Sequence, residues 1–405
     1  MSEQDRPLTV LCIACYFKGE EFMRECKRQG SRVLLLTSKN LEHQKWPRES
    51  IDEIFYMEED NYLWNIANLV KGVSYLARTE RIDRIVPLDD FDLEKAAALR
   101  EHLRVPGMGD TRTRFFRDKL SMRVKTHEDG ILVPPFVHVL NYQALNNYMA
   151  RTQPPWVIKP RMQASAVGIK KLYTPEQLWD TLGKLGDEQS FYLLEQFIPG
   201  DIYHVDSIVV GGEVVFSRVN RYLATPWEVS HEGGIFRTQT VVHGSADETA
   251  LRRLNQEVMS SLGLIRGVSH TEYIKAHEDG RFYFLETSAR VGGAHIAEMV
   301  EASSGISLWR EWAKLETLPA GKAYQLPEVR NEYSGLITTL ARQETPDTSA
   351  YNDPEVTWRM SKAHHAGLIV HSSSYERVSE LLEHYLHRFR EDFHTSLPAP
   401  DNPTS

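Results

Sequence analysis

The sequence has little that would place the protein in a membrane or an export pathway. Its longest uninterrupted apolar run, from Val10 to Phe17, is far shorter than the roughly 20 residues that a membrane-spanning helix needs. The first residues, MSEQDRPL, are polar and include acids, unlike a secretory signal with its basic start and apolar centre. We therefore expect a cytoplasmic protein.

The chain is also poor in cysteine and carries no excess of positive charge. Only three cysteines occur among 405 residues, and Cys12 and Cys15 lie in one strand-like run, where their spacing puts them on opposite faces. We interpret both as reduced core residues, because a four-ligand zinc site has no further partners here. With 56 acidic and 47 basic residues the formal net charge is -9, so the chain has no excess of basic residues with which to bind nucleic acid. Small-molecule partners are the prediction.

The first hundred residues lack the G-x-G-x-x-G fingerprint of dinucleotide-binding domains, yet strands and helices alternate in them. Predicted strands at 8–16, 32–37, 51–57 and 82–88 flank helices at 19–30, 61–79 and 93–103. This order predicts a Rossmann-like α/β unit with a parallel sheet. Asp89, Asp90 and Asp92 follow the fourth strand, where ligands bind in such sheets. We interpret them as solvated loop acids, with substrate contact as the alternative.

From residue 106 onward the pattern changes to α+β. Predicted helices at 175–185 and 247–262 separate short strands at 155–160, 191–198, 204–210, 213–219, 268–275 and 281–288. Two further strands, 331–341 and 366–371, precede a helix on which Val378, Leu381, Tyr385 and Phe389 share one face. These elements predict a small closing domain. The tail 395–405 is rich in proline, and we expect it to be disordered.

Two acids point to a metal site in the strand pair 268–275 and 281–288. The intervening Glu278-Asp279-Gly280 predicts a hairpin with a three-residue loop that ends in glycine. In that register Glu272 faces Glu286, and opposed carboxylates repel unless a cation lies between them. Oxygen ligands favour Mg²⁺ or Mn²⁺. A two-residue turn would instead place the glutamates on opposite faces, and an exposed hairpin with incidental acids is the alternative.

Other segments upstream are suited to a nucleotide, although each is a weak signal alone. Lys119 and Lys159 offer point charges for phosphate. The small-residue turn 163–168 lets backbone N–H groups approach the same oxygens. The strand that leads into 195–200 can offer backbone donors and acceptors to an adenine edge.

The order of these segments resembles the ATP-grasp superfamily over about residues 1 to 320. Residues 117–123 (RDKLSMR) are similar to the family's first lysine motif, and residues 156–160 (WVIKP) to its second. The resemblance implies a mixed α/β and α+β architecture. Its expected parts are a Rossmann-like domain (1–105), two α+β ATP-grasp lobes (106–190 and 191–328), a small C-terminal α+β domain (329–394) and the tail (395–405).

The resemblance also implies a role for individual residues. Lys119 and Lys159 would contact ATP phosphates under a loop that contains Ser165 and Gly168. Adenine would be recognised by Glu195, Gln196, Phe197 and Ile198. Asp201 would bind the ribose. Glu272 and Glu286 would bind the metal, with Ser288 where the family usually has asparagine, and Arg290 would steady the reacting carboxyl and phosphoryl groups.

The run 288–305 most resembles the amino-acid ligase branch of the family, in which Gly292 and Gly293 would place N–H groups near the substrate carboxylate. His270 shares a strand face with Glu272 and is the candidate general base. The implied activity is an ATP- and magnesium-dependent carboxylate-amine ligase. It would form an amide through an acyl phosphate and release ADP and phosphate. Relatives commonly form homodimers.

Three alternatives remain open at this point. A carboxylate-thiol ligase shares the same lobes. A biotin carboxylase-type enzyme usually carries a Q-V-E-H run after the arginine, where this chain has Gly292-Gly293-Ala294-His295. A non-catalytic ATP-binding regulatory protein would account for Ser288, which is a poorer magnesium ligand than asparagine.

Overall fold

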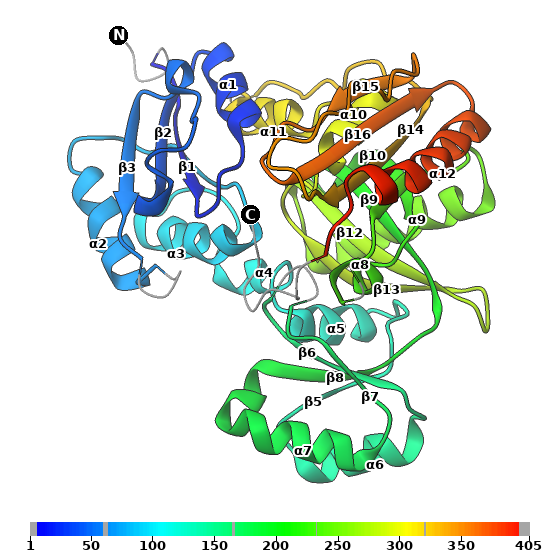
Figure 1. Cartoon of the computed structure of the whole chain (residues 1–405). Coiled ribbons are helices and arrows are strands. Elements are labelled where there is room, and N and C mark those ends of the chain that lie inside the picture. Colours follow the sequence, from blue (N-terminus) through cyan, green and yellow to red (C-terminus); the bar gives the residue numbers. More distant parts are fainter. Residues whose placement is uncertain (1–5, 60–63, 164–166, 232, 320, 397–405) are drawn as a thin grey trace.

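The computed structural model describes residues 6–59, 64–163, 167–231, 233–319 and 321–396. Their strands form three sheets, of four, eight and four strands. Figure 1 shows the N-terminal unit beside the large sheet, with the smaller mixed unit below it. No helix within the described ranges combines the length and apolarity that a membrane crossing demands.

The N-terminal sheet is parallel, in the order β3-β2-β1-β4. Its strands are β1 (Thr9–Ala14), β2 (Arg32–Ser38), β3 (Glu53–Met57) and β4 (Arg84–Pro87), and its helices are α1 (Glu20–Arg28), α2 (Ile66–Leu76) and α3 (Leu93–Leu103). Every residue of β1 is buried, because helices cover both faces of such a sheet. The predicted Rossmann-like unit with a parallel sheet is confirmed.

The cysteines lie where the strand alternation placed them. Cys12 belongs to the core cluster that includes Cys26 of α1, whereas Cys15 packs against the cluster on the other face of β1. All three thiols are free, and burial raises the pKa of each.

A thiol-labelling prediction follows, because the thiolate is the reactive form. In the folded protein Cys12 and Cys26 should resist iodoacetamide at pH 8, while all three cysteines should react after unfolding in guanidinium. Peptide mass spectrometry reads the result. Alkylation of Cys12 at the same rate in folded and unfolded protein would contradict the burial of Cys12 in this core.

The second sheet has the order β5-β8-β6-β7. Its elements are β5 (Phe136–His138), β6 (Trp156–Pro160), β7 (Lys170–Leu172) and β8 (Tyr192–Gln196), with α4 (Asp110–Arg114), α5 (Lys119–Glu128), α6 (Tyr142–Arg151) and α7 (Pro175–Leu185). Leu145 and Leu178 from α6 and α7 share one core with Trp156 and Ile158 of β6. The two helices thus cover the face of this sheet that lies away from the large sheet (Figure 1).

The large antiparallel sheet has the order β13-β12-β9-β10-β11-β14-β16-β15. Its strands are β9 (Gly200–Val210), β10 (Glu213–Tyr222), β11 (Phe236–Thr240), β12 (Arg266–Ala276), β13 (Phe282–Ser288), β14 (Tyr333–Leu340), β15 (Val356–Arg359) and β16 (His365–Ser372). The accompanying helices are α8 (Pro226–His231), α9 (Ala246–Leu262), α10 (Ile296–Ser304), α11 (Leu308–Thr317) and α12 (Tyr375–Asp392). Short 3-10 turns occupy Lys39–Leu41, Arg48–Ser50, Asp90–Asp92 and Gly186–Phe191.

The C-terminal strands continue the large sheet, since β14 pairs with β11. The expected domain boundary at residue 329 therefore separates strands that belong to one continuous sheet. This boundary stays a proposal, as do the other domain boundaries. The apolar face predicted for α12 is confirmed, because Val378, Leu381, Tyr385 and Phe389 are all buried. Of the tail predicted to be disordered, residues 397–405 lie outside the described residues, while the Thr395 N–H donates to Leu340 O at 3.1 Å.

Candidate active site

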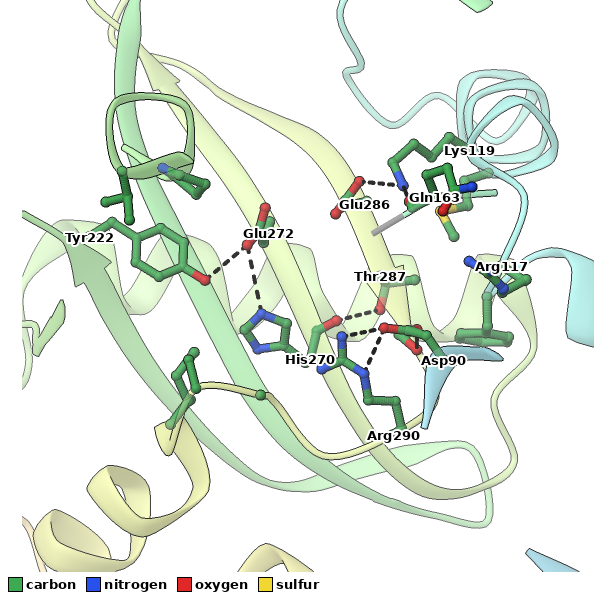
Figure 2. A pocket seen from close by; sticks show the side chains of 18 of the residues that line it. Asp90, Arg117, Lys119, Gln163, Tyr222, His270, Glu272, Glu286, Thr287 and Arg290 are labelled. Carbon is green, nitrogen blue, oxygen red and sulfur yellow. Dashed lines mark hydrogen bonds and ion pairs between the residues drawn. The ribbon is translucent and has the colours of Figure 1, made fainter. Parts of the chain in front are cut away.

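A cavity of about 300 Å³ opens where the three units meet (Figure 2). The charged and polar side chains that line it come from distant parts of the chain. They are Asp90, Arg117, Lys119, Gln163, Tyr222, His270, Glu272, Glu286, Thr287, Ser288 and Arg290. Phe116, Met122, Pro226, Val229, Phe236 and Ile296 supply apolar wall.

The pairing of β13, β12 and β9 brings polar residues together at one side of this cavity. One cross-strand row contains Ser288, His270 and Asp206, and the next row contains Glu286, Glu272 and His204. Residues two apart along a strand share a face, so the two rows lie side by side on one face of the sheet. Of these residues Ser288, Glu286, His270 and Glu272 line the cavity, while Asp206 and His204 of β9 lie buried beside them.

The two glutamates face each other as predicted, but by another route. The loop between β12 and β13 is longer than the expected three residues: the Ala276 N–H donates to Arg281 O at 2.9 Å and so encloses four residues, 277–280. Near the turn the pairing is therefore one residue out of the predicted register, with Tyr273 opposite Phe284. A β-bulge restores it, so that Glu272 pairs with Glu286.

Each of these glutamates has one oxygen engaged. Tyr222 donates its hydroxyl to Glu272 Oε1 at 2.9 Å, and His270 Nε2 lies 3.7 Å from the same oxygen. Lys119 Nζ lies 3.0 Å from Glu286 Oε2. Among the described residues, no hydrogen bond or ion pair engages the second oxygen of either carboxylate.

This donor set fits a divalent cation. Two carboxylates face one another across neighbouring strands, each with an oxygen to spare, and their side chains are 19% and 34% exposed to the cavity. Hard oxygen donors in a partly hydrated cleft are what Mg²⁺ and Mn²⁺ prefer. A cation there would remove the repulsion between the two charges.

Lys119 connects the glutamates to the small-residue loop. Besides the contact with Glu286, its Nζ donates to the Gln163 carbonyl oxygen at 2.7 Å. Ser165 of that loop lies outside the described residues. Gly168 has φ +72°, and a Cβ there would lie 2.8 Å from Pro160 Cγ, so glycine is required for the loop to return over β6.

Lys159 belongs to a buried ion-pair network. Its ammonium contacts Glu195, and Arg123 Nε donates to the same carboxylate at 3.1 Å. Burial alone would raise the pKa of Glu195, but Arg123 and Lys159 lower it below its usual value. Arg123 also donates to the carbonyl oxygen of Leu285, the extra residue of the bulge. One arginine therefore ties the second lysine motif to the metal-site hairpin.

The segment expected to read adenine has fewer free donors than predicted. The N–H groups of Gln196 and Phe197 donate to the carbonyl oxygens of Pro135 and Pro155 at 2.8 and 3.0 Å. The Glu195 side chain points into the ion-pair network, and the role of the segment at adenine stays a proposal. Sequence reasoning missed Lys171, whose Nζ lies 3.4 Å from the Phe197 ring centroid.

Asp201, expected at the ribose, lies close to the start of β9. Its Oδ1 accepts a hydrogen bond from Arg221 Nη2 at 2.9 Å, and its side chain is 37% exposed. Its carboxylate can still reach a ligand, because a second oxygen remains.

Arg290 pairs with an aspartate from the N-terminal unit. Its Nε donates to Asp90 Oδ2 at 2.8 Å, and the Ser288 hydroxyl donates to Asp90 Oδ1. Although burial alone would raise the pKa of Asp90, Arg290 and Arg117 lower it below its usual range. Ser288 is therefore hydrogen-bonded to Asp90, and its role as a third metal ligand stays a proposal.

The interpretation of the first-domain acids as solvated was wrong. Asp89, Asp90 and Asp92 are all buried, because they begin the turn into α3 beneath the cavity. Asp89 pairs with Lys18, and Asp92 accepts from the Cys15 N–H at 3.0 Å. Asp90 lines the cavity, in line with the alternative that we kept open.

His270 is held by a carboxylate. Its Nδ1 lies 2.8 Å from Asp206 Oδ1. Burial alone would lower the pKa of His270, but Asp206 outweighs it and raises the pKa to about 9.

The turn after Arg290 brings backbone to the cavity. Gly293 and Ala294 line it, while Ala294 and His295 have φ of +51° and +62°. α10 begins only at Ile296, because these positive φ values keep the turn non-helical. Gly292 packs against the His270 side chain.

Comparisons with known proteins identify the fold. The sequence profile of the ATP-grasp domain matches residues 152–298. The solved L-amino acid ligase from Bacillus licheniformis superposes with a TM-score of 0.77 over 96% of this chain and 98% of that one, at 18% identity. Biotin carboxylase from Campylobacter jejuni superposes with a TM-score of 0.71 over 96% and 92%, at 13% identity. The predicted ATP-grasp fold is confirmed.

Two curated proteins are similar in sequence. An L-arginine-specific L-amino acid ligase of Bacillus subtilis is 25% identical over 236 residues, which cover 56% of each chain. The match thus spans little more than half of that relative's length. A D-alanine--D-alanine ligase of Prosthecochloris aestuarii is 24% identical over 326 residues, or 74% of this chain and 84% of the relative.

Proposed function

We propose that this protein, which carries an ATP-grasp domain in an ATP-grasp fold, is an ATP-dependent carboxylate-amine ligase. The observation that carries the proposal is the convergence of two facing carboxylates, Lys119 and Arg290 on one cavity. Sequence similarity to two named amino-acid ligases favours this class over a carboxylase or a thiol ligase.

In the proposed reaction one oxygen of a substrate carboxylate attacks the γ-phosphorus of ATP. The bond to the bridging oxygen breaks, and ADP leaves. An amine then attacks the acyl carbon of the acyl phosphate, inorganic phosphate leaves with the bonding pair, and the amine loses a proton. No protein side chain needs to become covalently attached.

The chain's charges are suited to this first step. Lys119 and Lys159 would neutralise phosphate oxygens, with adenine between β8 and the loop near Gly168 and the ribose at Asp201. Positioning and electrostatic stabilisation dominate phosphoryl transfer. Glu272 and Glu286, with Ser288 beside them, would hold Mg²⁺ or Mn²⁺, which supplies further positive charge at the transferring group.

The carboxylate substrate would lie on the opposite side of the cavity. Arg290, kept rigid by Asp90, would orient the carboxyl group, and the backbone at Gly292 and Gly293 would present N–H groups to it. His270, held through Nδ1 by Asp206, would present Nε2 beside Glu272 and act as the general base that accepts a proton from the amine.

The proposal is tested by measuring ADP and phosphate release with Mg-ATP across amino acids, singly and in pairs. Mass spectrometry of the products should show a species lighter by one water than the sum of an acid and an amine. Bicarbonate-dependent turnover would favour the carboxylase, and dependence on a thiol the thiol ligase. ATP binding without turnover on any pair would favour a nucleotide sensor.

We also propose a cytoplasmic homodimer, on the strength of the resemblance to the ligase branch. Light scattering after gel filtration should give twice the 46.6 kDa mass of the chain, and a single-chain mass would overturn this part of the proposal.

A further inference from the structure

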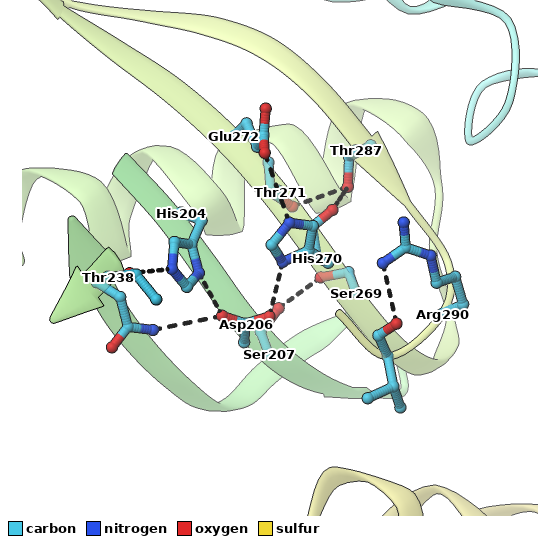
Figure 3. A network of polar contacts seen from close by, with 12 residues as sticks. His204, Asp206, Ser207, Thr238, Ser269, His270, Thr271, Glu272, Thr287 and Arg290 are labelled. Atoms are coloured by element: carbon cyan, nitrogen blue, oxygen red, sulfur yellow. Dashed lines mark hydrogen bonds and ion pairs between the residues drawn. The ribbon is translucent and has the colours of Figure 1, made fainter. Parts of the chain in front are cut away.

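A buried polar network lies behind Glu272 (Figure 3). Asp206 accepts on both sides: His270 Nδ1 lies 2.8 Å from its Oδ1 and His204 Nδ1 lies 2.7 Å from its Oδ2. His204 Nε2 continues the chain to Thr238 Oγ1 at 2.7 Å. His204 and Asp206 are fully buried, and neither lines the cavity.

These groups are arranged as a hydrogen-bonded chain. The ligand atoms of His204, Asp206 and His270 lie within 4.8 Å of one another, a spacing that also suits a metal ion. However, Nδ1 of His204 and Nδ1 of His270 both lie at hydrogen-bond distance from the Asp206 carboxylate. A proton on each Nδ1 therefore explains the short distances without a metal ion. A carboxylate that orients an imidazole through Nδ1 fixes which nitrogen faces outward.

The outward nitrogen is directed at the metal-site carboxylate. With Nδ1 on Asp206, His270 Nε2 faces Glu272 Oε1 at 3.7 Å, the oxygen that also accepts from Tyr222. The Tyr222 ring packs on His204, with centroids 4.7 Å apart. Both neighbours of Glu272 Oε1, Tyr222 and His270, therefore contact the same network.

Gly292 covers the hydrogen bond between His270 and Asp206. A Cβ at this position would lie 2.9 Å from Asp206 Oδ1 and 3.0 Å from His270 Nδ1. Real Cβ atoms rarely come so close, so the turn that follows Arg290 can lie on the pair only because the residue has no side chain. This close approach excludes water from the bond.

We propose that Asp206 is a positioning residue: it fixes the ring of His270 through Nδ1, and thereby orients Glu272 for the metal ion, under a cover provided by Gly292. The role that this inference gives to the metal ion rests on the proposed function. Outer-sphere partners of this kind typically change metal affinity or activity by about 10- to 100-fold when removed.

The test compares Asp206→Asn with Ser207→Ala. Ser207 is the next residue of β9, equally buried, but it bonds Ser269 and Asn255 on the opposite face. Mn²⁺ affinity, read by electron paramagnetic resonance without substrates, should fall about 10- to 100-fold in Asp206→Asn and stay unchanged in Ser207→Ala. A downfield proton resonance from the His270 Nδ1–H should be present in the wild type and absent in Asp206→Asn.

Gly292→Ala provides a second arm that leaves Asp206 in place. Its Cβ should disturb the same bond, so it should lose the resonance and weaken Mn²⁺ binding as well. Unchanged Mn²⁺ affinity in both variants would overturn the proposal. A metal ion found on His204, Asp206 and His270 by anomalous scattering would also overturn it. Failure of the wild type to bind Mn²⁺ would instead count against the proposed function.

Discussion

Replacing Glu286 by glutamine should abolish most metal-dependent turnover while leaving the fold intact. Glutamine keeps the shape of the side chain but removes the charge that faces Glu272 and contacts Lys119. Loss of one group that stabilises developing charge typically lowers kcat about 10²- to 10³-fold. The unfolding transition should move little, because repulsion from Glu272 is relieved as the contact with Lys119 weakens. Steady-state ADP release and circular dichroism measure the two quantities.

The matched control is Glu278→Gln, in the turn of the same hairpin. Glu278 is exposed, and it does not line the cavity. Its activity should equal that of the wild type. Wild-type turnover in Glu286→Gln would remove the metal assignment, and loss of turnover in both variants would attribute the effect to the hairpin as a whole.

Replacing Arg123 by methionine should both destabilise the protein and weaken the metal site. The guanidinium is fully buried and binds Glu195 and the Leu285 carbonyl oxygen. Removing one partner of a buried ion pair typically costs about 3–5 kcal/mol. Because Leu285 is the bulged residue that sets the register of Glu286, Mn²⁺ affinity should fall as well. Urea unfolding and Mn²⁺ titration report the two effects.

Two variants separate these causes. Arg114→Met removes an exposed arginine whose partner is Asp110 on α4, and should cost no more than about 1 kcal/mol. Arg123→Lys keeps the charge but cannot bridge both acceptors with a planar fork, so it should recover stability more than metal affinity. Unchanged Mn²⁺ affinity in Arg123→Met would show that the bulge holds its register without this arginine.

The parts predicted well from the sequence depend on short-range patterns. Strands such as β1 and β2 are continuous apolar runs, and α12 shows its buried face at helical spacing. The pairing of Glu272 with Glu286 also followed from a local turn. There the prediction was correct although the loop is longer than assumed, because a bulge compensates for the extra residue.

The remainder of the site depends on contacts between distant segments. Asp90 and Arg290 are 200 positions apart, and no local pattern distinguishes an acid that pairs across a cavity from one in a solvated loop. His204 and Asp206 did carry a signal, since they stand two residues apart in a largely apolar strand. Only the register of β9 beside β12 shows that this face lies behind Glu272.

Isotope transfer tests the central claim most directly. Once a substrate pair has been found, its acid is supplied with ¹⁸O in both carboxylate oxygens, and the released phosphate is analysed by mass spectrometry or ³¹P NMR. Attack of the carboxylate on the γ-phosphorus predicts one ¹⁸O atom in each phosphate, with the other retained in the amide. Phosphate that contains no ¹⁸O, released in step with product, would contradict an acyl-phosphate intermediate and with it the assignment of this cavity.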